Sequence, residues 1–317
     1  MKILHVGNVA SVSYNLCREL RKKNIETDLI YRIKSCLVSG TDEEWVYLVK
    51  NRLQSLRLCN INLKNYDLIH CHYLVNLLSL GLRIRNLRIP VILHCHGSDT
   101  RPNRLIYKIV QRLVLTQSNT LLYSTPDLLF NLSKFKKEKI YLPNPVNLTK
   151  EIPKNKKYDN RILIFSKLYK IKQIEKLFPI IKNLNYDFDI PYVGKDREYY
   201  KRIAPRNVHF IKPTPHDKVF DLLTKYKLVI GQQTGTICVS ELESMSCKIP
   251  TLFPFKYNNF YKKPLPMKEI TEKNIKESFN NPHLGEQQSE WVKEFHNSEK
   301  LCERLMEIYN HVLKEKN

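Results

Sequence analysis

Short apolar segments alternate with stretches of helical periodicity along the whole chain. Each apolar segment has the length of a buried β-strand, and the stretches between them suit helices, of which residues 103–116 are one example. Strands that alternate with helices form parallel sheets, so the pattern predicts an α/β fold. Strands are expected at residues 2–6, 26–31, 67–71, 90–95, 120–123 and 139–142, and then at 161–165, 188–193, 208–211, 228–231 and 250–253.

The alternation is interrupted at residues 143–159, which are rich in proline, asparagine and lysine. This composition is typical of a linker, and 317 residues exceed one ordinary core. We expect a first doubly wound domain over residues 1–150 and a second over 151–290. Helical spacing over residues 286–316 predicts two helices; residues 291–317 are expected to be helical, and packing back toward the first domain is one arrangement open to them.

The chain is strongly basic, with 53 Lys and Arg against 31 Asp and Glu and a formal net charge of +22. The resulting field attracts anions. The basic residues are scattered and form no RNA-binding or zinc-finger motif, so we expect no specific nucleic-acid partner. Peripheral contact with an anionic membrane surface stays open beside the simpler interpretation of a solvated, lysine-rich surface.

The absence of targeting features in the sequence predicts a cytoplasmic protein. The N-terminus has no signal-peptide pattern, and no apolar run reaches the roughly 20 residues of a membrane span. The eight cysteines form no disulfide framework, which favours a reducing compartment. The expected location is therefore the cytoplasm, with a peripheral position at the cytoplasmic membrane face left open.

Two lysines bracket the turn that follows the strand at residues 161–165. Lys167 lies within the turn, and Lys172 lies where a helix is expected to begin, near Ile171. Two ammonium groups and the positive end of a helix together suit a diphosphate. In a chain with so many lysines, ordinary solvated side chains are the other interpretation.

A second polar loop follows the strand at residues 228–231. It contains Gly235 and Thr236 and leads into a helix that carries Glu243. Glycine in such a loop lets backbone N–H groups approach a phosphate closely. The Glu243 carboxylate is placed to accept hydrogen bonds from a ribose, although the helix dipole alone also favours a glutamate in a first turn.

The chain contains several short motifs whose order and spacing resemble those of glycosyltransferase family 4. Members of that family have the GT-B fold, in which two Rossmann-like doubly wound domains face each other across a cleft. The resemblance covers nearly the whole chain. It depends on the N-terminal strand with its Gly7 loop and on the segments DLIHCHY, HCHGSD, YLPNPVN, FSKLYKIKQI, YVGKD, ELESMSCKIP and WVKEFHNSEKL.

The resemblance implies a hexosyltransferase that uses a nucleotide-sugar donor, retains the anomeric configuration and requires no metal. Its acceptor stays open among a glycan, a lipid-linked acceptor, a protein and a small molecule. Lys167 and Lys172 would hold and stabilise the departing diphosphate, Glu243 would bind the ribose, and His96 would face the donor sugar as a catalytic helper. The remaining donor-binding positions would be Gly7, Asn8, Gly97, Asp99, Gly235 and Thr236.

Three positions depart from the family pattern. Gly235 stands where the first glutamate of a pair is expected, Gly7 is alone where more glycines are usual, and Lys167 replaces an arginine. Lysine loses the forked phosphate contact of arginine. These departures leave open a degenerate GT-B fold that binds nucleotide or polyanion without turnover.

Two patterns resemble metal sites. His70 and His72, like His94 and His96, form His-x-His pairs of the kind found in metal-dependent hydrolases, but no further well-placed ligand is evident beyond Asp99. Residues 187–189 read Asp-Phe-Asp, which we interpret as a turn. Hydrogen-bonded histidines at strand ends are the favoured interpretation, and no metal ligand is assigned.

Overall fold

A computed structural model describes residues 1–32, 43–49, 61–74, 76, 88–97, 117–147 and 161–315 of the chain. The chain forms two compact units, one comprising Met1–Pro145 with Ser298–Asn317 and the other Val146–Asn297. The final helix, α12 (Ser298–Lys314), therefore belongs to the first unit, although 152 residues of the second unit precede it in the chain. Of the helices within the described ranges, none is both long enough and apolar enough to cross a membrane.

The first unit is built on a parallel sheet of seven strands in the order β3-β2-β1-β4-β5-β6-β7. The order runs outward from β1 in both directions, so the chain reverses its direction of winding between β1 and β4. In doubly wound sheets such a reversal opens a ligand crevice beyond the carboxyl ends of the two strands. The strands are β1 (Lys2–Val6), β2 (Glu26–Arg32), β3 (Val46–Val49), β4 (Leu68–His72), β5 (Val91–Cys95), β6 (Thr120–Tyr123) and β7 (Lys139–Tyr141).

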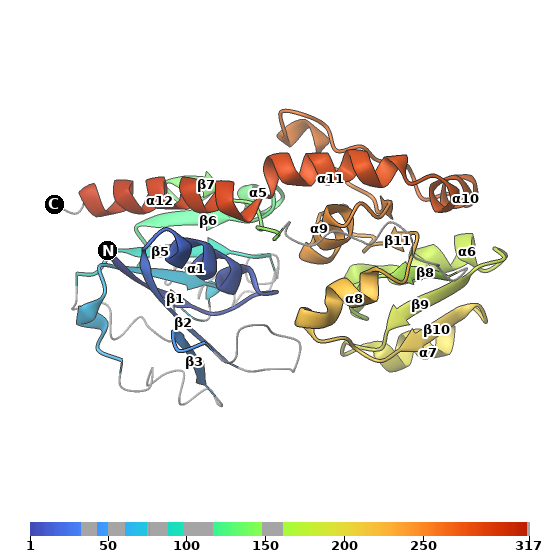
Figure 1. Ribbon diagram of the computed structural model, residues 1–317, viewed down its shortest axis with the longest axis horizontal. Coiled ribbons are helices and arrows are strands. Elements are labelled where there is room, and N and C mark those ends of the chain that lie inside the picture. The colour runs from blue at the N-terminus through green and yellow to red at the C-terminus, as the bar shows by residue number, and fades with distance from the viewer. Residues whose placement is uncertain are drawn as a thin grey trace. The chain divides into compact units, whose positions relative to one another are not determined.

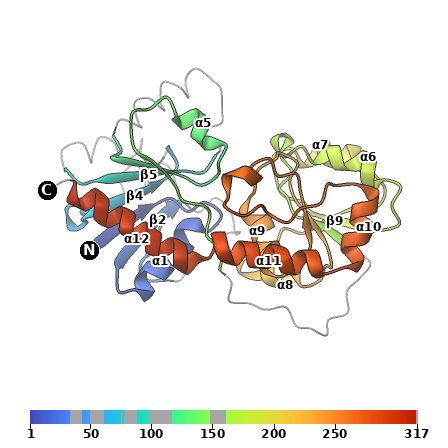
Figure 2. The same cartoon turned by 90° about the horizontal axis from the view of Figure 1, so that it is seen from above.

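The two faces of this sheet differ in chemistry. One face is apolar, with Leu4, Ile69 and Leu93 packed over α5 (Leu128–Leu132). The opposite face carries α1 (Val12–Lys22) and α12, which pack against each other, as Figure 2 shows from above. Strand residues alternate between the faces, so the histidines of the His-x-His pairs all point toward this second face.

The second unit has a five-stranded parallel sheet in the order β10-β9-β8-β11-β12, and its reversal point lies between β8 and β11. These strands are β8 (Arg161–Ile164), β9 (Asp187–Pro191), β10 (Val208–Ile211), β11 (Val229–Ile230) and β12 (Thr251–Leu252). Its helices are α6 (Phe178–Ile181), α7 (Arg197–Ile203), α8 (Val219–Leu223), α9 (Val239–Ser246), α10 (Glu272–Asn280) and α11 (His283–Phe295) (Figure 1).

Helix α11 packs on α9 and on strand β12. The buried Gln288 side chain accepts from the Thr251 N–H and donates to the Thr251 C=O, each at 2.9 Å, and so closes the free edge of β12. Gly285 allows this approach because a Cβ there would lie 2.2 Å from the Lys248 carbonyl oxygen. Helix α11 is thereby held against β12, and α9, which carries candidate site residues, packs against α11.

The α/β class and the parallel sheets predicted from the sequence are confirmed. Strand β3 was not predicted. Two local predictions are wrong: residues 187–189 lie in strand β9, and the segment after Ile171 forms the 3₁₀ turns η3 (Lys170–Lys172) and η4 (Ile174–Leu177) before the short helix α6. The predicted helix at residues 103–116 and most of the predicted linker lie outside the described residues.

The Asp-Phe-Asp segment is occupied by structural contacts. Arg161 donates from Nε to Asp189 at 2.7 Å and its Nη1 lies 3.5 Å from Asp187. Tyr226 also donates to Asp189, at 2.8 Å. An arginine and a tyrosine that bind the buried carboxylate in this way leave it no role as a metal ligand.

Candidate functional site

Lys167 and Lys172 lie in the loop that leaves β8 at the reversal point of the second sheet. The Lys167 side chain is exposed, yet the protein around it partly desolvates the ammonium and lowers its pKa, and the positive charge of Lys172 lowers it further. Two cations close enough to repel each other favour an anion between or beside them. The structure therefore brings together the two lysines that the sequence indicated.

Lys172 is held by the opposite side of the reversal point. Its Nζ donates to Gln232 Oε1 and lies 3.2 Å from Cys238 Sγ. Its carbonyl oxygen accepts from the Gln233 N–H at 3.0 Å. Gln232 follows β11, and Cys238 is the N-cap residue of α9. The loops after β8 and β11 are thus joined where a doubly wound sheet binds ligands.

Glu241, in the first turn of α9, binds the backbone of the loop that holds Lys172. Its side chain is buried, and its carboxylate accepts from the N–H groups of Gln232 and Cys238, both at 2.9 Å. Burial raises the Glu241 pKa, although the two backbone donors and the charge of Lys172 oppose that rise. Gly231 is required here, because a Cβ would lie 2.4 Å from Glu241 Oε1. No role was predicted for Glu241 from the sequence.

Gly235 and Thr236 shape the loop between β11 and α9. Gly235 adopts φ +82°, a left-handed conformation that L-residues rarely take, and a Cβ there would lie 2.8 Å from Lys256 Cδ. Thr236 is buried and its Oγ1 lies 3.0 Å from Thr234 Oγ1. The backbone at the position of the family's first glutamate is therefore built for glycine.

Glu243 lies on α9 and pairs with His216, for which no role was predicted from the sequence. Its Oε1 lies 2.6 Å from His216 Nε2, and both side chains are largely buried. Burial alone would lower the His216 pKa, but the hydrogen bond and negative charge of Glu243 outweigh it and raise that pKa. A ribose that bound Glu243 would share or displace this contact.

The loop of Lys167 rests on the segment YVGKD. Leu168 donates to the Val193 C=O at 2.7 Å, and the Asp196 N–H donates to the Leu168 C=O at 3.1 Å. Gly194, at φ +140°, makes the close approach possible, since a Cβ would lie 2.3 Å from the Leu168 carbonyl oxygen. This motif therefore positions the lysine loop.

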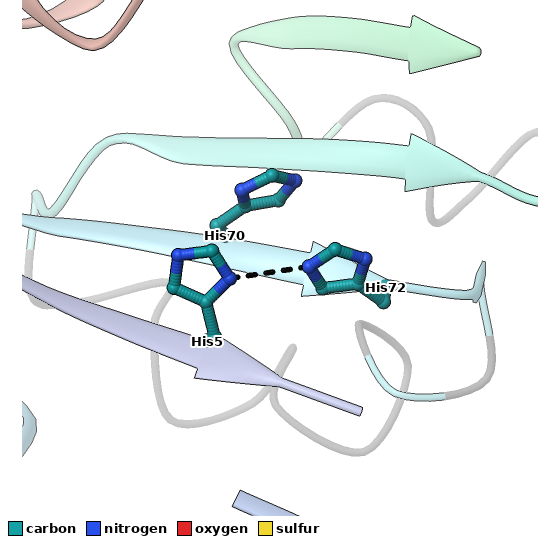
Figure 3. Close-up of side chains that lie close together, drawn as sticks. All are labelled: His5, His70 and His72. Carbon is teal, nitrogen blue, oxygen red and sulfur yellow. Dashed lines mark hydrogen bonds between the residues drawn. The ribbon is translucent and has the colours of Figure 1, made fainter. Parts of the chain in front are cut away.

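In the first unit, histidines gather beneath α12. His5 and His70 are register partners on β1 and β4, and His72 and His94 are register partners on β4 and β5. Figure 3 shows the rings of His5, His70 and His72 turned toward a common space, with His5 Nδ1 3.2 Å from His72 Nε2. His96, just beyond β5, lies 2.9 Å from His72 through Nε2.

These histidines are neutral. Burial lowers the pKa of both His5 and His96 to about 3, and it holds the pKa values of His70, His72 and His94 well below the ordinary value. His96 is the only member of the set that is partly exposed to solvent within the described structure. It therefore reaches the surface in its neutral form.

Two histidine triplets have the proximity of metal ligands, with ring nitrogens within 4.8 Å of one another: His5 with His70 and His72, and His72 with His94 and His96. Neither triplet includes a carboxylate from the described part of the chain. The nitrogens that would face a metal already bind one another, His5 to His72 and His72 to His96. Hydrogen bonds between neutral rings are one account of these contacts, and three nitrogens this close together are also the ligand set that a metal ion would need.

The other predicted residues of the first unit lie at its reversal point. Gly7 follows β1 with φ +95°, and a Cβ there would lie 2.7 Å from the His72 carbonyl oxygen. Asn8 Oδ1 accepts from the Tyr14 N–H at 3.3 Å. Gly97, at φ +103°, follows His96. Asp99 lies outside the described residues.

Residues 9–150 match the family profile of Glycosyltransferase Family 4, which confirms the resemblance seen in the motifs. A search of curated protein sequences finds no match.

Solved structures extend the likeness to the whole chain. A sucrose-phosphate synthase from Thermosynechococcus elongatus aligns with TM-score 0.75 and 12% identity, covering 99% of this chain and 100% of that one. HepE of Anabaena, in complex with UDP and glucose, aligns with TM-score 0.74 and 10% identity over 98% of this chain and 100% of its own. The pneumococcal O-GlcNAc transferase GtfA, in complex with UDP and GlcNAc, aligns with TM-score 0.68 and 10% identity over 99% of each chain. At these identities the likeness establishes the fold, which is GT-B.

Proposed function

We propose that this GT-B chain, whose residues 9–150 match Glycosyltransferase Family 4, is a glycosyltransferase that moves a hexosyl group from a nucleoside-diphosphate sugar to an acceptor hydroxyl. The observation that carries the proposal is the pair of ammonium groups, Lys167 and Lys172, at the reversal point of the second sheet. Desolvation first, and the charge of Lys172 second, lower the Lys167 pKa, and a bound diphosphate would relieve the repulsion between the two ammonium groups.

The lysines would act on the leaving group. As the bond from the anomeric carbon to the diphosphate breaks, the diphosphate leaves with the electron pair, and its negative charge grows. Cations already in place stabilise that charge without reorganisation. Gln232 and Cys238 hold Lys172 in its place before the donor arrives. Lysines in this role require no metal ion, and we propose none.

The acceptor oxygen would bond to the anomeric carbon on the face that the diphosphate leaves, which gives retention of configuration. Its proton would pass to the departing phosphate oxygen. His96 is unsuited to take it, because burial lowers the His96 pKa to about 3 and a good base has a pKa near the working pH.

Uridine diphosphate sugars are the donors to test first. HepE and GtfA were both crystallised with UDP, and this chain shares their fold. Glu243 is the candidate ribose ligand, with His216 beside it at 2.6 Å to hold the carboxylate in place. The acceptor would be a glycan that is free, lipid-linked or attached to protein.

Two measurements test the proposal. In a thermal-shift panel of nucleotides and nucleotide sugars, one nucleoside-diphosphate sugar should raise the melting temperature of the protein. A ligand at a hundred times its Kd stabilises the folded state by about 2.7 kcal/mol. Incubation with that donor should then release the free nucleoside diphosphate. If the donor binds but no nucleoside diphosphate is released, whichever acceptor is added, the protein is better described as a non-catalytic nucleotide or polyanion binder. Gly235 and the net charge of +22 support that alternative.

We also propose that the protein works in the cytoplasm, at or near the membrane face. The cysteines within the described structure, Cys17, Cys71, Cys95, Cys238, Cys247 and Cys302, form no disulfide, as expected in a reducing compartment. The net charge of +22 favours anionic headgroups. Flotation with vesicles of phosphatidylglycerol and phosphatidylcholine should carry the protein at low salt and lose it at high salt; the absence of flotation at low salt would contradict a membrane contact.

A further inference from the structure

Three histidines of the first unit, His72, His94 and His96, meet where strands β4 and β5 end. His72 and His94 are register partners on the two strands, and His96 follows His94 by two residues. The ring centroids lie 4.2, 5.2 and 5.3 Å apart. One nitrogen of each ring lies within 4.8 Å of a nitrogen of each of the other two. Two parallel strands thus bring three imidazoles to one point.

The His94 ring has a lone pair that no described group uses. Its Nε2 lies 3.3 Å from the Leu142 carbonyl oxygen. A carbonyl oxygen can only accept, so Nε2 carries the proton of the neutral ring and donates it. The lone pair is then on Nδ1, a buried atom with no hydrogen-bond partner in the described part of the chain. A histidine that donates one N–H to a backbone carbonyl and keeps the other nitrogen bare is oriented as metal-bound histidines are.

The other two rings already have nearly the spacing of metal ligands. His72 Nδ1 lies 2.9 Å from His96 Nε2. Two nitrogens bound to tetrahedral zinc at about 2.0 Å are separated by about 3.3 Å, so the rings would move apart by only roughly 0.4 Å. Burial lowers the pKa of both rings and keeps them neutral, which is the form that binds a metal.

His72 also belongs to the second triplet, with His5 and His70, but it can serve only one of the two. A neutral imidazole has a single lone pair. If His72 Nδ1 binds the ion beside His96, its Nε2 carries the proton and can donate to His5 Nδ1, 3.2 Å away. The rings of His5, His70 and His72 are all fully buried, so an ion held by them would have no position open to water. The triplet that includes the partly exposed His96 is therefore the better site.

We propose that His72, His94 and His96 bind a zinc ion. Three imidazole nitrogens with water in the fourth position form an open zinc site, and His96 is the ligand beside which that water enters. The cysteines between the histidines take no part, because Cys71 and Cys95 lie in the apolar core on the other face of the sheet. The ion cross-links β4 to β5. It has no role in the leaving-group step at the lysines, so the site does not rest on the proposed function.

Zinc titration of the full-length protein, prepared without a histidine tag, tests the site. The protein is treated with a chelator, dialysed into metal-free buffer and titrated with zinc chloride in a calorimeter. We expect one saturable equivalent per chain and a higher melting temperature once it is bound. Cobalt in place of zinc should give the visible absorption of a tetrahedral centre. The absence of a saturable site in the chelator-treated protein would overturn the proposal.

Single substitutions locate the ion. His94→Gln and His96→Gln each remove one ligand and should weaken zinc binding by roughly a hundredfold or more, the upper range for losing only an outer-shell partner. The matched control is His70→Gln, which removes a ring as buried as that of His94 but belongs only to the other triplet. It should bind zinc as the unchanged protein does. Unchanged zinc affinity in either ligand variant, or its loss in His70→Gln, would overturn the assignment.

X-ray absorption at the zinc edge provides a readout that needs no variant. Three imidazole nitrogens and one oxygen at about 2.0 Å are expected around the ion, whereas a sulfur ligand would overturn the proposal, because cysteines would then hold the zinc. Should His94→Gln not fold, His96→Gln changes a partly exposed ring and this spectrum decides beside it. Absence of sugar transfer by the unchanged protein would count against the proposed function and leave the zinc result standing.

Discussion

Lys172 Nζ lies 3.2 Å from the Sγ of Cys238, the residue that caps the N-terminus of helix α9. A cation at the positive end of a helix is the reverse of the arrangement that stabilises a helix. Gln232 and the nearby buried Glu241 offset part of this repulsion. An anion at this position would relieve the rest, which is why the pair indicates a site for a negatively charged ligand.

The first prediction concerns Lys172. Replacement by methionine keeps the length and apolar stem of the side chain and removes the charge. We expect kcat for sugar transfer to fall by about a hundredfold or more, as when one transition-state donor is removed. Melting temperature should change little, because the lost repulsion with Lys167 and the helix end is offset by the lost hydrogen bond to Gln232 and the lost attraction to the buried Glu241.

Lys176→Met is the matched control for this experiment, since Lys176 is an exposed lysine in the following turn, η4. It should transfer sugar at the rate of the unchanged protein. Equal loss of activity in both variants would mean that general charge, and not the position of Lys172, governs the reaction.

The sequence was sufficient for the framework of the fold but not for its irregular parts. Buried parallel strands appear as continuous apolar runs, and every such run that was predicted is a strand. Strand β3 was missed although residues 45–49 are an apolar run; it is only four residues long and lies at the edge of the sheet, with Tyr47 exposed. The turn after Ile171 was taken for a helix, but Gln173 adopts φ +55° and breaks the helical path.

The site was only partly predictable for a related reason. Lys167 and Lys172 are near each other in sequence, and a turn was enough to bring them together. Glu241 and His216 could not be recognised, because their roles depend on partners from other loops. The alternation of His70 and His72 indicated a shared face, whereas Tyr309 contacts His70 and His5 only because α12 returns to the first unit.

The second prediction concerns the Glu243–His216 pair. In Glu243→Gln the carboxylate charge is lost, so the His216 pKa, raised in the folded protein, should fall toward or below its ordinary value, because burial is then opposed only by the weaker charge effect of Asp217. A titration followed by NMR of the His216 ring measures this. Affinity for UDP should weaken several-fold if Glu243 binds the ribose. Asp187→Asn, which removes an exposed carboxylate 2.8 Å from His209, should leave UDP affinity unchanged.

Because of the same pair, the free energy of unfolding should depend on pH, with a stabilising contribution that is lost as pH rises. His216 binds its proton more tightly in the folded state than in the unfolded state, where its pKa is about 6.5. Its contribution is therefore fully present below about pH 6.5 and is lost as pH rises through the higher folded-state pKa. Denaturant unfolding should show the Glu243→Gln protein less stable than the parent near pH 6, with the gap narrowing at pH 8. A gap that widens with pH would contradict the assignment.

The third prediction concerns Gly235. Alanine there must adopt φ +82° and place its Cβ 2.8 Å from Lys256 Cδ, so Gly235→Ala should destabilise the protein by about 1–3 kcal/mol. Guanidinium unfolding measures the change. Repeating the substitution in a Lys256→Ala background separates the two causes, because the contact disappears while the backbone strain stays. A cost that vanishes entirely in that background would mean that the left-handed backbone is not needed.

The fourth prediction uses the departure from the family pattern at Lys167. Arginine presents five donors in a planar fork and can bind a diphosphate with two parallel hydrogen bonds, whereas lysine acts as a point charge. Lys167 is exposed, so the larger head group has room to extend. Lys167→Arg should therefore lower the Kd for UDP several-fold in calorimetry, and the gain in affinity should persist better at high salt because directed hydrogen bonds are less screened than a point charge.

Lys170→Arg, at an exposed neighbour whose ammonium lies 4.5 Å from the Tyr199 ring centroid, should give no such gain in UDP affinity. Equal or weaker UDP binding by Lys167→Arg would indicate that this side chain does not reach the diphosphate, and the anion site would then depend on Lys172 alone.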